Sequence, residues 1–419
     1  MNVPGDFGRS DRMLLQASAG LLMLTPILMV ASREVPPTIL VIATVLLMVA
    51  AYRARSVRAV LVDLASTLCT PAGLVFGGLV LLMASSLMWS PVAERGANHA
   101  LHFAGGVVLG AIAITTSLRL RPGFNAFIFA LILSIAAIIV AMDMWLSGAL
   151  REGLSLSTRA SRLNRAAVAI TLLLPLATVL LLMERRLVLL VVLWIAAALA
   201  VLLSASYSAK LAFGLFLLIL PLTLVAPNLL HRASMIVLPL ITLSMPWIAS
   251  VANALVPGRI HDAVGYGSLT IRGEIWRETF PFIWEKPYFG WGIEASHALA
   301  RLPEAAHLTD MQRGLLDWGH THNAPLQIWL ELGMVGAALA AAALYFGLRA
   351  MRVLPPALLP YAMTTVVAAF AIACVSHGAW QAWWWALLGL IAAAYAMAIA
   401  TYLPEAIRPK VSPTVDASA

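Results

Sequence analysis

The sequence HTHNAPLQIWLELGMVGAALAAAALYFGL, residues 320–348, joins a polar segment directly to an apolar helix. The polar segment, Pro257 to Asn323, holds five of the nine histidines and four of the thirteen tryptophans. On either side of it the chain consists mainly of long apolar runs. Titratable bases and cations are rarely kept at a membrane face without a function. We therefore expect the function in this segment.

The composition predicts an all-α polytopic membrane protein. Of 419 residues, 62% are hydrophobic and only 11% are charged, which excludes a soluble globular protein. The net charge of +8 does not indicate nucleic-acid binding, because the basic residues lie in short loops between apolar runs. About twelve transmembrane helices are expected, at Met13–Ala31, Thr38–Tyr52, Gly73–Trp89, Leu101–Ser117, Phe124–Leu146, Ala166–Met183, Leu187–Ser206, Lys210–Ala226, Ala233–Leu255, Pro325–Leu348, Leu358–Ser376 and Gln381–Leu403.

These runs divide the chain into four parts. Residues 1–256 carry helices 1–9, residues 257–324 form an outer loop, residues 325–403 carry helices 10–12, and residues 404–419 form a polar, disordered tail. With the N-terminus in the cytoplasm, fourteen Lys and Arg residues face the cytoplasm and seven lie in short outer loops. Both termini are then cytoplasmic, and the loop between helices 9 and 10 faces the periplasm of a bacterial inner membrane.

One outer loop departs from this charge rule. Between Leu150 and Ala166 it carries four arginines, Arg151, Arg159, Arg162 and Arg165, against one acidic residue. Such a cluster is either a solvated basic loop or an anion site, since arginine donates bidentate hydrogen bonds to phosphate.

The polar segment begins with a predicted helix from about Thr270 to Trp284. Arg272 and Trp276 are four residues apart and should share one face of it. The following Pro287–Gly292 predicts a tight turn with exposed aromatic side chains.

At the end of the segment, Asn323 can cap the next helix, and Pro325 suits its first turn. His322 would then lie near the positive end of that helix, which keeps an imidazole neutral, as a general base requires. Gln327 and Glu331 follow at a spacing of four, and a carboxylate placed inside a span needs a partner. The same predicted helix contains two glycines, Gly333 and Gly336, which allow a neighbouring helix to pack closely against it.

Three interpretations compete for His320 and His322. A zinc site would add His297 and His307, but no cysteine cluster or His-Glu-x-x-His pattern supports it. A structural role, with both rings hydrogen-bonded at the interface, and a catalytic-base role remain open on the residues alone.

A set of spaced residues resembles the signature of the O-antigen ligase and polymerase superfamily. It comprises Ser268-x-x-x-Arg272, Trp276, Pro287-x-x-Gly290-x-Gly292, His320-x-His322-Asn323, Gln327, Glu331, Gly333 and Gly336. Asn164-Arg165 before the sixth helix adds a weaker match. Members commonly carry Ser-Arg at the outer start of the eighth helix, where this chain has Ser208-Ala209-Lys210. The resemblance therefore extends to Lys210 only if a point charge can replace a guanidinium.

The resemblance implies a metal-independent, cofactor-free glycosyltransferase with a fold like the C-type membrane glycosyltransferases. Its donor would be an O-antigen chain on undecaprenyl pyrophosphate, and its acceptor a hydroxyl of the lipid A–core oligosaccharide. His322 would be the base and His320 its orienter. Arg272, and less strongly Arg165, Arg162 and Lys210, would hold the pyrophosphate, with Asn323, Trp276, Gln327 and Glu331 in support.

Other functions are compatible with the same sequence. The O-antigen polymerase and the protein O-oligosaccharyltransferase share the signature, although the single dominant outer segment favours the ligase. A transporter or lipid flippase is a different class, which Asp143 and Glu331 keep open as charges within spans.

Overall fold

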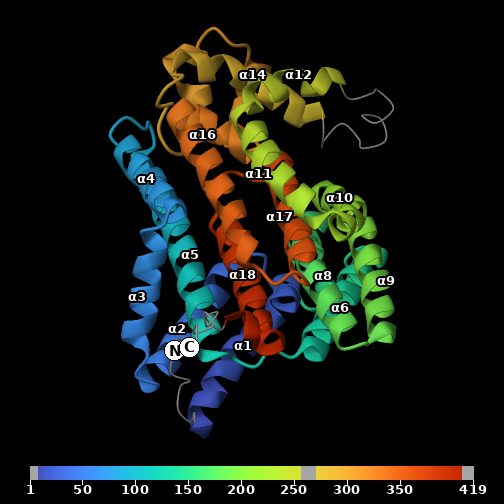
Figure 1. The fold of residues 1–419 in the computed structure, drawn as a ribbon. Helices are drawn as coiled ribbons and strands as arrows, with labels where there is room; N and C mark the ends of the chain where they lie inside the picture. Colours follow the sequence, from blue (N-terminus) through green and yellow to red (C-terminus); the bar gives the residue numbers. More distant parts are fainter. Residues whose placement is uncertain (1–7, 256–269, 408–419) are drawn as a thin grey trace, which may run out of the picture.

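The computed structural model describes residues 8–255 and 270–407. Within these residues the fold is all-helical (Figure 1). The longer helices, in chain order, are α1 (Arg9–Ala31), α2 (Val35–Arg53), α3 (Val57–Leu68), α4 (Pro71–Ser86), α5 (Ala93–Leu120), α6 (Ala126–Trp145), α8 (Asn164–Met183), α9 (Leu187–Leu203), α10 (Tyr207–Val225), α11 (Pro227–Leu243), α12 (Met245–Leu255), α14 (Thr270–Glu285), α16 (Ala324–Ala350), α17 (Leu359–Val375) and α18 (Ala382–Tyr402). Short helical turns, α7 (Ala149–Gly153) and α15 (Asp310–Leu316) among them, lie in the loops.

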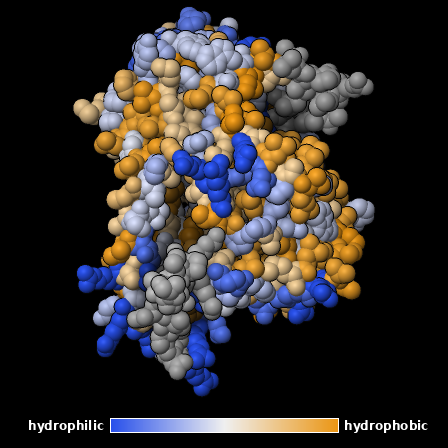
Figure 2. Space-filling model, in the orientation of Figure 1, coloured by the Kyte–Doolittle hydropathy of each residue, from blue (hydrophilic) through white to orange (hydrophobic). Residues whose placement is uncertain are grey.

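The predicted multi-pass membrane protein is confirmed in outline. Among the described residues, eight helices are long and apolar enough to cross a membrane, and two bent pairs raise the number to ten. Two shorter apolar helices, α9 and α17, coincide with the remaining predicted runs. Each of the twelve runs thus falls on an apolar helix or a bent pair, while the count of twelve spans stays a prediction. Hydrophobic side chains cover much of the face seen in Figure 2.

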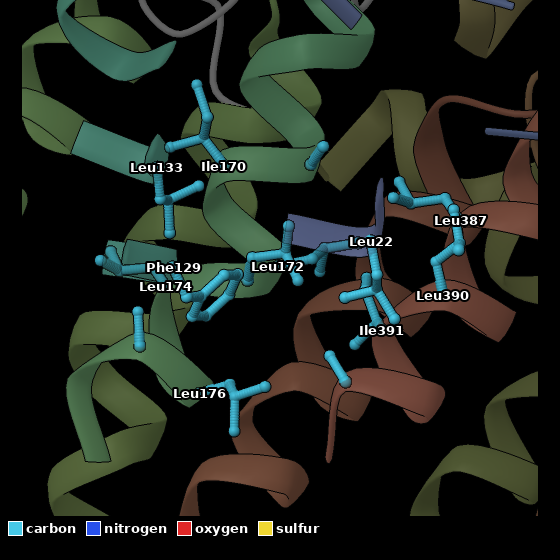
Figure 3. Packing of buried hydrophobic residues seen from close by; sticks show 14 of the residues in the cluster. Leu22, Phe129, Leu133, Ile170, Leu172, Leu174, Leu176, Leu387, Leu390 and Ile391 are labelled. Carbon is cyan, nitrogen blue, oxygen red and sulfur yellow. The ribbon is translucent and has the colours of Figure 1, made fainter. Parts of the chain in front are cut away.

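The core of the bundle is built around α8. Every residue of this helix from Ala166 to Leu181 is buried. Figure 3 shows the packing of its leucines and of Ile170 against Leu22 of α1, Phe129 and Leu133 of α6, and Leu387, Leu390 and Ile391 of α18. A helix that is apolar on all sides is stable only in such a surrounded position. This packing holds α18 in place, and α18 begins at the site described below.

Two pairs of apolar helices are sharply bent. α3 and α4 meet at 78°, where Thr70 caps α4 and Pro71 occupies its first turn. α11 and α12 meet at 72°, next to Pro246, which has no N–H to continue the helix. The bend turns α12 across the outer end of the bundle, where it packs beside α14 (Figure 1). The predicted span Ala233–Leu255 missed the second bend, because both halves are apolar, and the predicted run Gly73–Trp89 did not include α3.

Candidate active site

Three segments far apart in the chain meet at the N-terminal end of α16. They are α14, the residues 317–323 that lead into α16, and residues 376–381 between α17 and α18. The predicted helix at Thr270–Trp284 is confirmed as α14, Thr270–Glu285. The start of the predicted outer loop and Ser268 of the signature lie outside the described residues.

A break in α16 receives the turn that follows α14. Gly333 has φ 66° and ψ −162° inside the helix, which frees backbone groups for other partners. The N–H groups of Trp291 and Gly292 donate to the carbonyls of Leu330 and Glu331, at 3.0 and 2.8 Å. Those of Met334 and Val335 donate back to Pro287 and Tyr288, at 2.8 and 3.1 Å.

The close approach of these two backbones explains the glycines of the signature. A Cβ at Gly333 would collide with the carbonyl group of Tyr288, and one at Gly290 with that of Glu331. Gly333 therefore accommodates the turn rather than a second transmembrane helix, which corrects the packing role predicted for it. Tyr288 and Phe289 are exposed as predicted, whereas Trp291 is buried and donates to the Phe282 carbonyl at 2.8 Å.

The carboxylate of Glu331 joins α16 to the loop that carries Glu294 and Ser296 and to the segment at residues 376–381. It is fully buried and accepts five hydrogen bonds from four residues. The donors are the N–H of Glu294 at 2.7 Å, the N–H and Oγ of Ser296 at 3.4 and 2.6 Å, Nε2 of Gln327 at 2.8 Å and Nε1 of Trp380 at 2.6 Å. The partner expected for a carboxylate inside a span is thus a set of neutral donors. Glu331 and Gln327 serve as anchors for the loops.

The start of α16 agrees with the prediction. The Asn323 side chain accepts from the Leu326 N–H at 3.0 Å and caps the helix, and Pro325 lies in the first turn. The indole Nε1 of Trp276 donates to the Thr321 carbonyl at 2.7 Å. Trp276 of α14 therefore fixes the loop that carries both histidines.

The backbone carbonyl of Ser376 holds the His322 ring in one tautomer. Its Nδ1 lies 3.2 Å from the carbonyl oxygen of Ser376, which can only accept, so Nδ1 carries the proton and Nε2 keeps its lone pair. The His322 N–H donates to Nδ1 of His320 at 3.1 Å. His322 also has φ 53°, a left-handed conformation that costs about 1–2 kcal/mol for a residue with a side chain. Strain of this kind is typical of functional positions.

Both histidines are neutral at pH 7. Burial, followed by the charge of Arg272, lowers the pKa of His322 to about 4, against a smaller opposing effect of the Ser376 hydrogen bond. Burial, followed by the charges of its neighbours, lowers the pKa of His320 to about 3. The predicted neutral state is therefore right, but burial is its main cause rather than the helix end.

The charge of Arg272, on α14, acts on both histidines and contributes to the lowering of their pKa values. The guanidinium is half-buried, and no described residue forms a hydrogen bond or an ion pair with it. Burial lowers its pKa, since no carboxylate compensates for the lost hydration. The prediction that Arg272 and Trp276 share a face holds, because one acts on His322 and the other on Thr321. Among the described residues, Arg272 is thus a cation without a hydrogen-bond or ion-pair partner, and its charge acts on a neutral imidazole.

The other predicted anion-binding residues are less closely placed. Arg165 pairs with Glu34 at 2.7 Å, and its guanidinium lies over the Trp383 ring at 4.5 Å, at the start of α18. Arg162 is exposed. Lys210 lies over the Tyr207 ring at 5.1 Å, and no described contact joins it to the histidines. Of these three, Arg165 alone is connected to the site.

The arginine-rich outer loop is not one site. Arg151 is buried and pairs with Asp143 at 2.6 Å. Its remaining donors bind the carbonyls of Ser157, Thr158 and Arg159. Arg151 and Asp143 therefore hold the loop together.

Residues 376–381 were missed by the sequence analysis. Ser376 orients His322, and the Ala379 N–H donates to Oε1 of Gln327 at 2.9 Å. His377 is 9% exposed, and its ring contacts Trp383 edge to face and Trp384 in a tilted arrangement. The available signal was a histidine next to a glycine and a tryptophan cluster between two apolar runs. His307, which the zinc interpretation used, is exposed, and the residues described contain no group of three metal-ligating side chains.

Comparison with known proteins gives a match to a protein family. Residues 163–341 match the family model described as O-antigen ligase. This range begins just before α8 and ends within α16, so it includes α14, both histidines and Arg272. No curated protein matches the chain. The family match confirms the resemblance found from the sequence motifs.

Proposed function

We propose that this chain, which belongs to the O-antigen ligase superfamily through its domain at residues 163–341, is an O-antigen ligase. It transfers an O-antigen polysaccharide from undecaprenyl pyrophosphate to a hydroxyl of the lipid A–core oligosaccharide, in the periplasm. The orientation of His322 carries the proposal: Nδ1 is bound to the Ser376 carbonyl, Nε2 has no partner among the described residues, and the charge of Arg272, which no described residue pairs, acts on the ring.

The chemistry assigns one role to each group. The acceptor hydroxyl oxygen attacks the anomeric carbon of the donor while Nε2 of His322 takes its proton. The bond from that carbon to the phosphate oxygen breaks, and undecaprenyl pyrophosphate leaves with one more negative charge. Arg272 stabilises this charge electrostatically. Displacement on the opposite face inverts the anomeric configuration.

Donor binding also prepares the base. A pKa of about 4 makes His322 a weak base in the free protein. Burial is the larger cause of that low value and the positive charge of Arg272 the second. A bound pyrophosphate offsets the charge of Arg272 and adds negative charge of its own, so it raises the pKa of His322 towards neutral pH. The base therefore becomes effective when the donor is in place.

The supporting residues act by position. Trp276 and Asn323 hold the chain on either side of His322, at Thr321 and at the start of α16, and His320 accepts the backbone N–H of His322. Gln327 and Glu331 fix the loop that carries Ser376. None of these needs to contact the sugar for the base to be aligned.

A lipopolysaccharide gel on a strain lacking the gene tests the proposal. We expect loss of all long chains on the lipid A–core and accumulation of polymerised lipid-linked donor, both restored by the wild-type gene. His322→Ala should fail to restore them, whereas His307→Ala, an exposed histidine of the same outer segment, should succeed. A single repeat unit left on the core would instead indicate a polymerase, and full restoration by His322→Ala would refute the assigned base.

A further inference from the structure

His377 has an unused hydrogen-bonding group beside the site. The side chain is 9% exposed, and its Nε2 is buried without a partner in the described structure. Buried polar atoms are almost always hydrogen-bonded, because an unmade bond lowers stability. Nε2 of His377 is buried without a described partner close to the proposed base, and we therefore expect it to bind a ligand.

The loop that carries His377 is firmly held. The Ser376 carbonyl accepts from His322, the Ala379 N–H donates to Gln327, and Trp380 donates to Glu331. Gly378 leaves no room for a side chain, since a Cβ there would lie 3.1 Å from Oε1 of Gln327. The missing partner of His377 is therefore not explained by a loose loop.

Two sources of positive charge act near this ring, Arg165 and the start of α18. The imidazole centroid lies 4.6 Å from that of Trp383, and the Arg165 guanidinium lies 4.5 Å from the same indole. The next residues begin α18, whose N-terminus carries partial positive charge, and the Gln381 side chain leaves that end uncapped by binding Trp383 instead. The carboxylate of Glu34, which pairs with Arg165, is 61% exposed and can be displaced.

We propose that His377, Arg165 and the first turn of α18 bind one phosphate of the donor pyrophosphate, while Arg272 binds the other. The inference rests on the proposed function, because it assumes a pyrophosphate leaving group. Ser376, whose carbonyl orients the base, and His377 are consecutive, so the proposed phosphate contact lies one residue along the chain from the group that orients the base. His377 donates its Nε2–H to a phosphate oxygen, and Arg165 exchanges Glu34 for the phosphate.

The test is the binding of inorganic pyrophosphate to the purified full-length protein, measured by calorimetry. His377→Phe keeps a flat ring against Trp383 and Trp384 but removes the donor, and should weaken pyrophosphate binding about 10- to 100-fold. His377→Gln places an amide nitrogen where Nε2 lies, and should stay within about threefold of wild type. His307→Phe is the matched control on an exposed histidine. If His377→Phe is not recovered as a folded protein, His377→Asn replaces it, because its amide is too short to reach the Nε2 position.

Unchanged pyrophosphate affinity in His377→Phe, or in its Asn replacement, would overturn the site. Because binding needs no transfer, the measurement separates this inference from the proposed function. A wild-type protein that binds pyrophosphate in a His377-dependent way but transfers no O-antigen would remove the function and keep the site. If the protein transfers O-antigen but its pyrophosphate affinity does not depend on His377, the proposed function is kept and the His377 site is refuted.

Discussion

Arg151 and Arg272 lie in two different polar segments of the chain, and their sequence surroundings are similar. Each is an arginine among polar residues between apolar runs, where an anion site is expected. In the structure Arg151 is buried, pairs with Asp143 and donates to three carbonyls. Arg272 is half-buried beside His322, and no described residue pairs with it. One guanidinium is saturated by its own loop and the other is free to bind a ligand.

The same contrast bears on the transporter alternative. Asp143 and Glu331 kept it open as charges within spans. Asp143 is the partner of Arg151, and Glu331 accepts five hydrogen bonds from the loops of the site. Both carboxylates are fully used by neighbouring groups, so neither needs a transported substrate to explain it. Unsatisfied donors, rather than the residue type, separate the functional group from the structural one.

The largest expected effect concerns stability. Arg151→Ala leaves Asp143 buried without its partner, and should lower the free energy of unfolding by about 3–5 kcal/mol, measured by denaturation of the purified protein in detergent. Transfer per folded molecule should stay unchanged. The double change to Arg151→Met with Asp143→Leu should recover most of the loss, since no charge is then left alone. If Arg151→Ala leaves stability unchanged but impairs donor binding, Arg151 binds the donor, and it does not differ in role from Arg272.

Arg272→Ala should behave in the opposite way. Removing one charge-assisted contact to phosphate should lower kcat/KM for the donor about 10- to 100-fold, with unfolding unaffected. Arg277→Ala is the control on the same helix, because Arg277 is exposed and pairs with Glu278. Equal donor kinetics for the two variants would assign Arg272 a structural role.

The pH dependence sharpens the role of Arg272 further. His322 must be neutral to accept a proton and its pKa is about 4, so kcat/KM for the donor should fall only as pH drops through about 4. Arg272→Ala removes a positive charge that lowers this pKa, and should move the acid limb to higher pH. In wild type, the limb of kcat should lie at higher pH than that of kcat/KM, because the bound pyrophosphate raises the pKa. If activity falls at the same acidic pH for wild-type kcat/KM, Arg272→Ala kcat/KM and wild-type kcat, Arg272 does not act on the base.

The elements that the sequence predicted correctly depend on near neighbours. Arg272 and Trp276 share a face because they are four apart on one helix, and Asn323 caps α16 through a residue three positions on. The hydrophobic runs place the helices for the same reason, since burial in a bundle or a membrane acts on each segment as a whole.

The parts that it missed depend on segments that meet only after folding. The carbonyl that fixes the tautomer of His322 belongs to Ser376, 54 residues further along. The break at Gly333 follows from hydrogen bonds to the turn at Pro287–Gly292, and a glycine in an apolar helix does not predict it. The structural role of Arg151 likewise depends on carbonyls of its own loop, which accept hydrogen bonds from its guanidinium only in the folded protein.

The smallest effect is expected at Asn323, which joins the two kinds of role. Asn323→Ala removes the cap of α16 and should lower the free energy of unfolding by about 1 kcal/mol, whereas Asn323→Ser, which can still cap, should lose much less. Because the cap fixes the residue after His322, transfer should also fall in the alanine variant and be rescued by serine. Thermal unfolding and single-turnover transfer on the same preparations decide this. If serine restores stability but not transfer, Asn323 contacts the substrate, and it belongs with Arg272 rather than with Arg151.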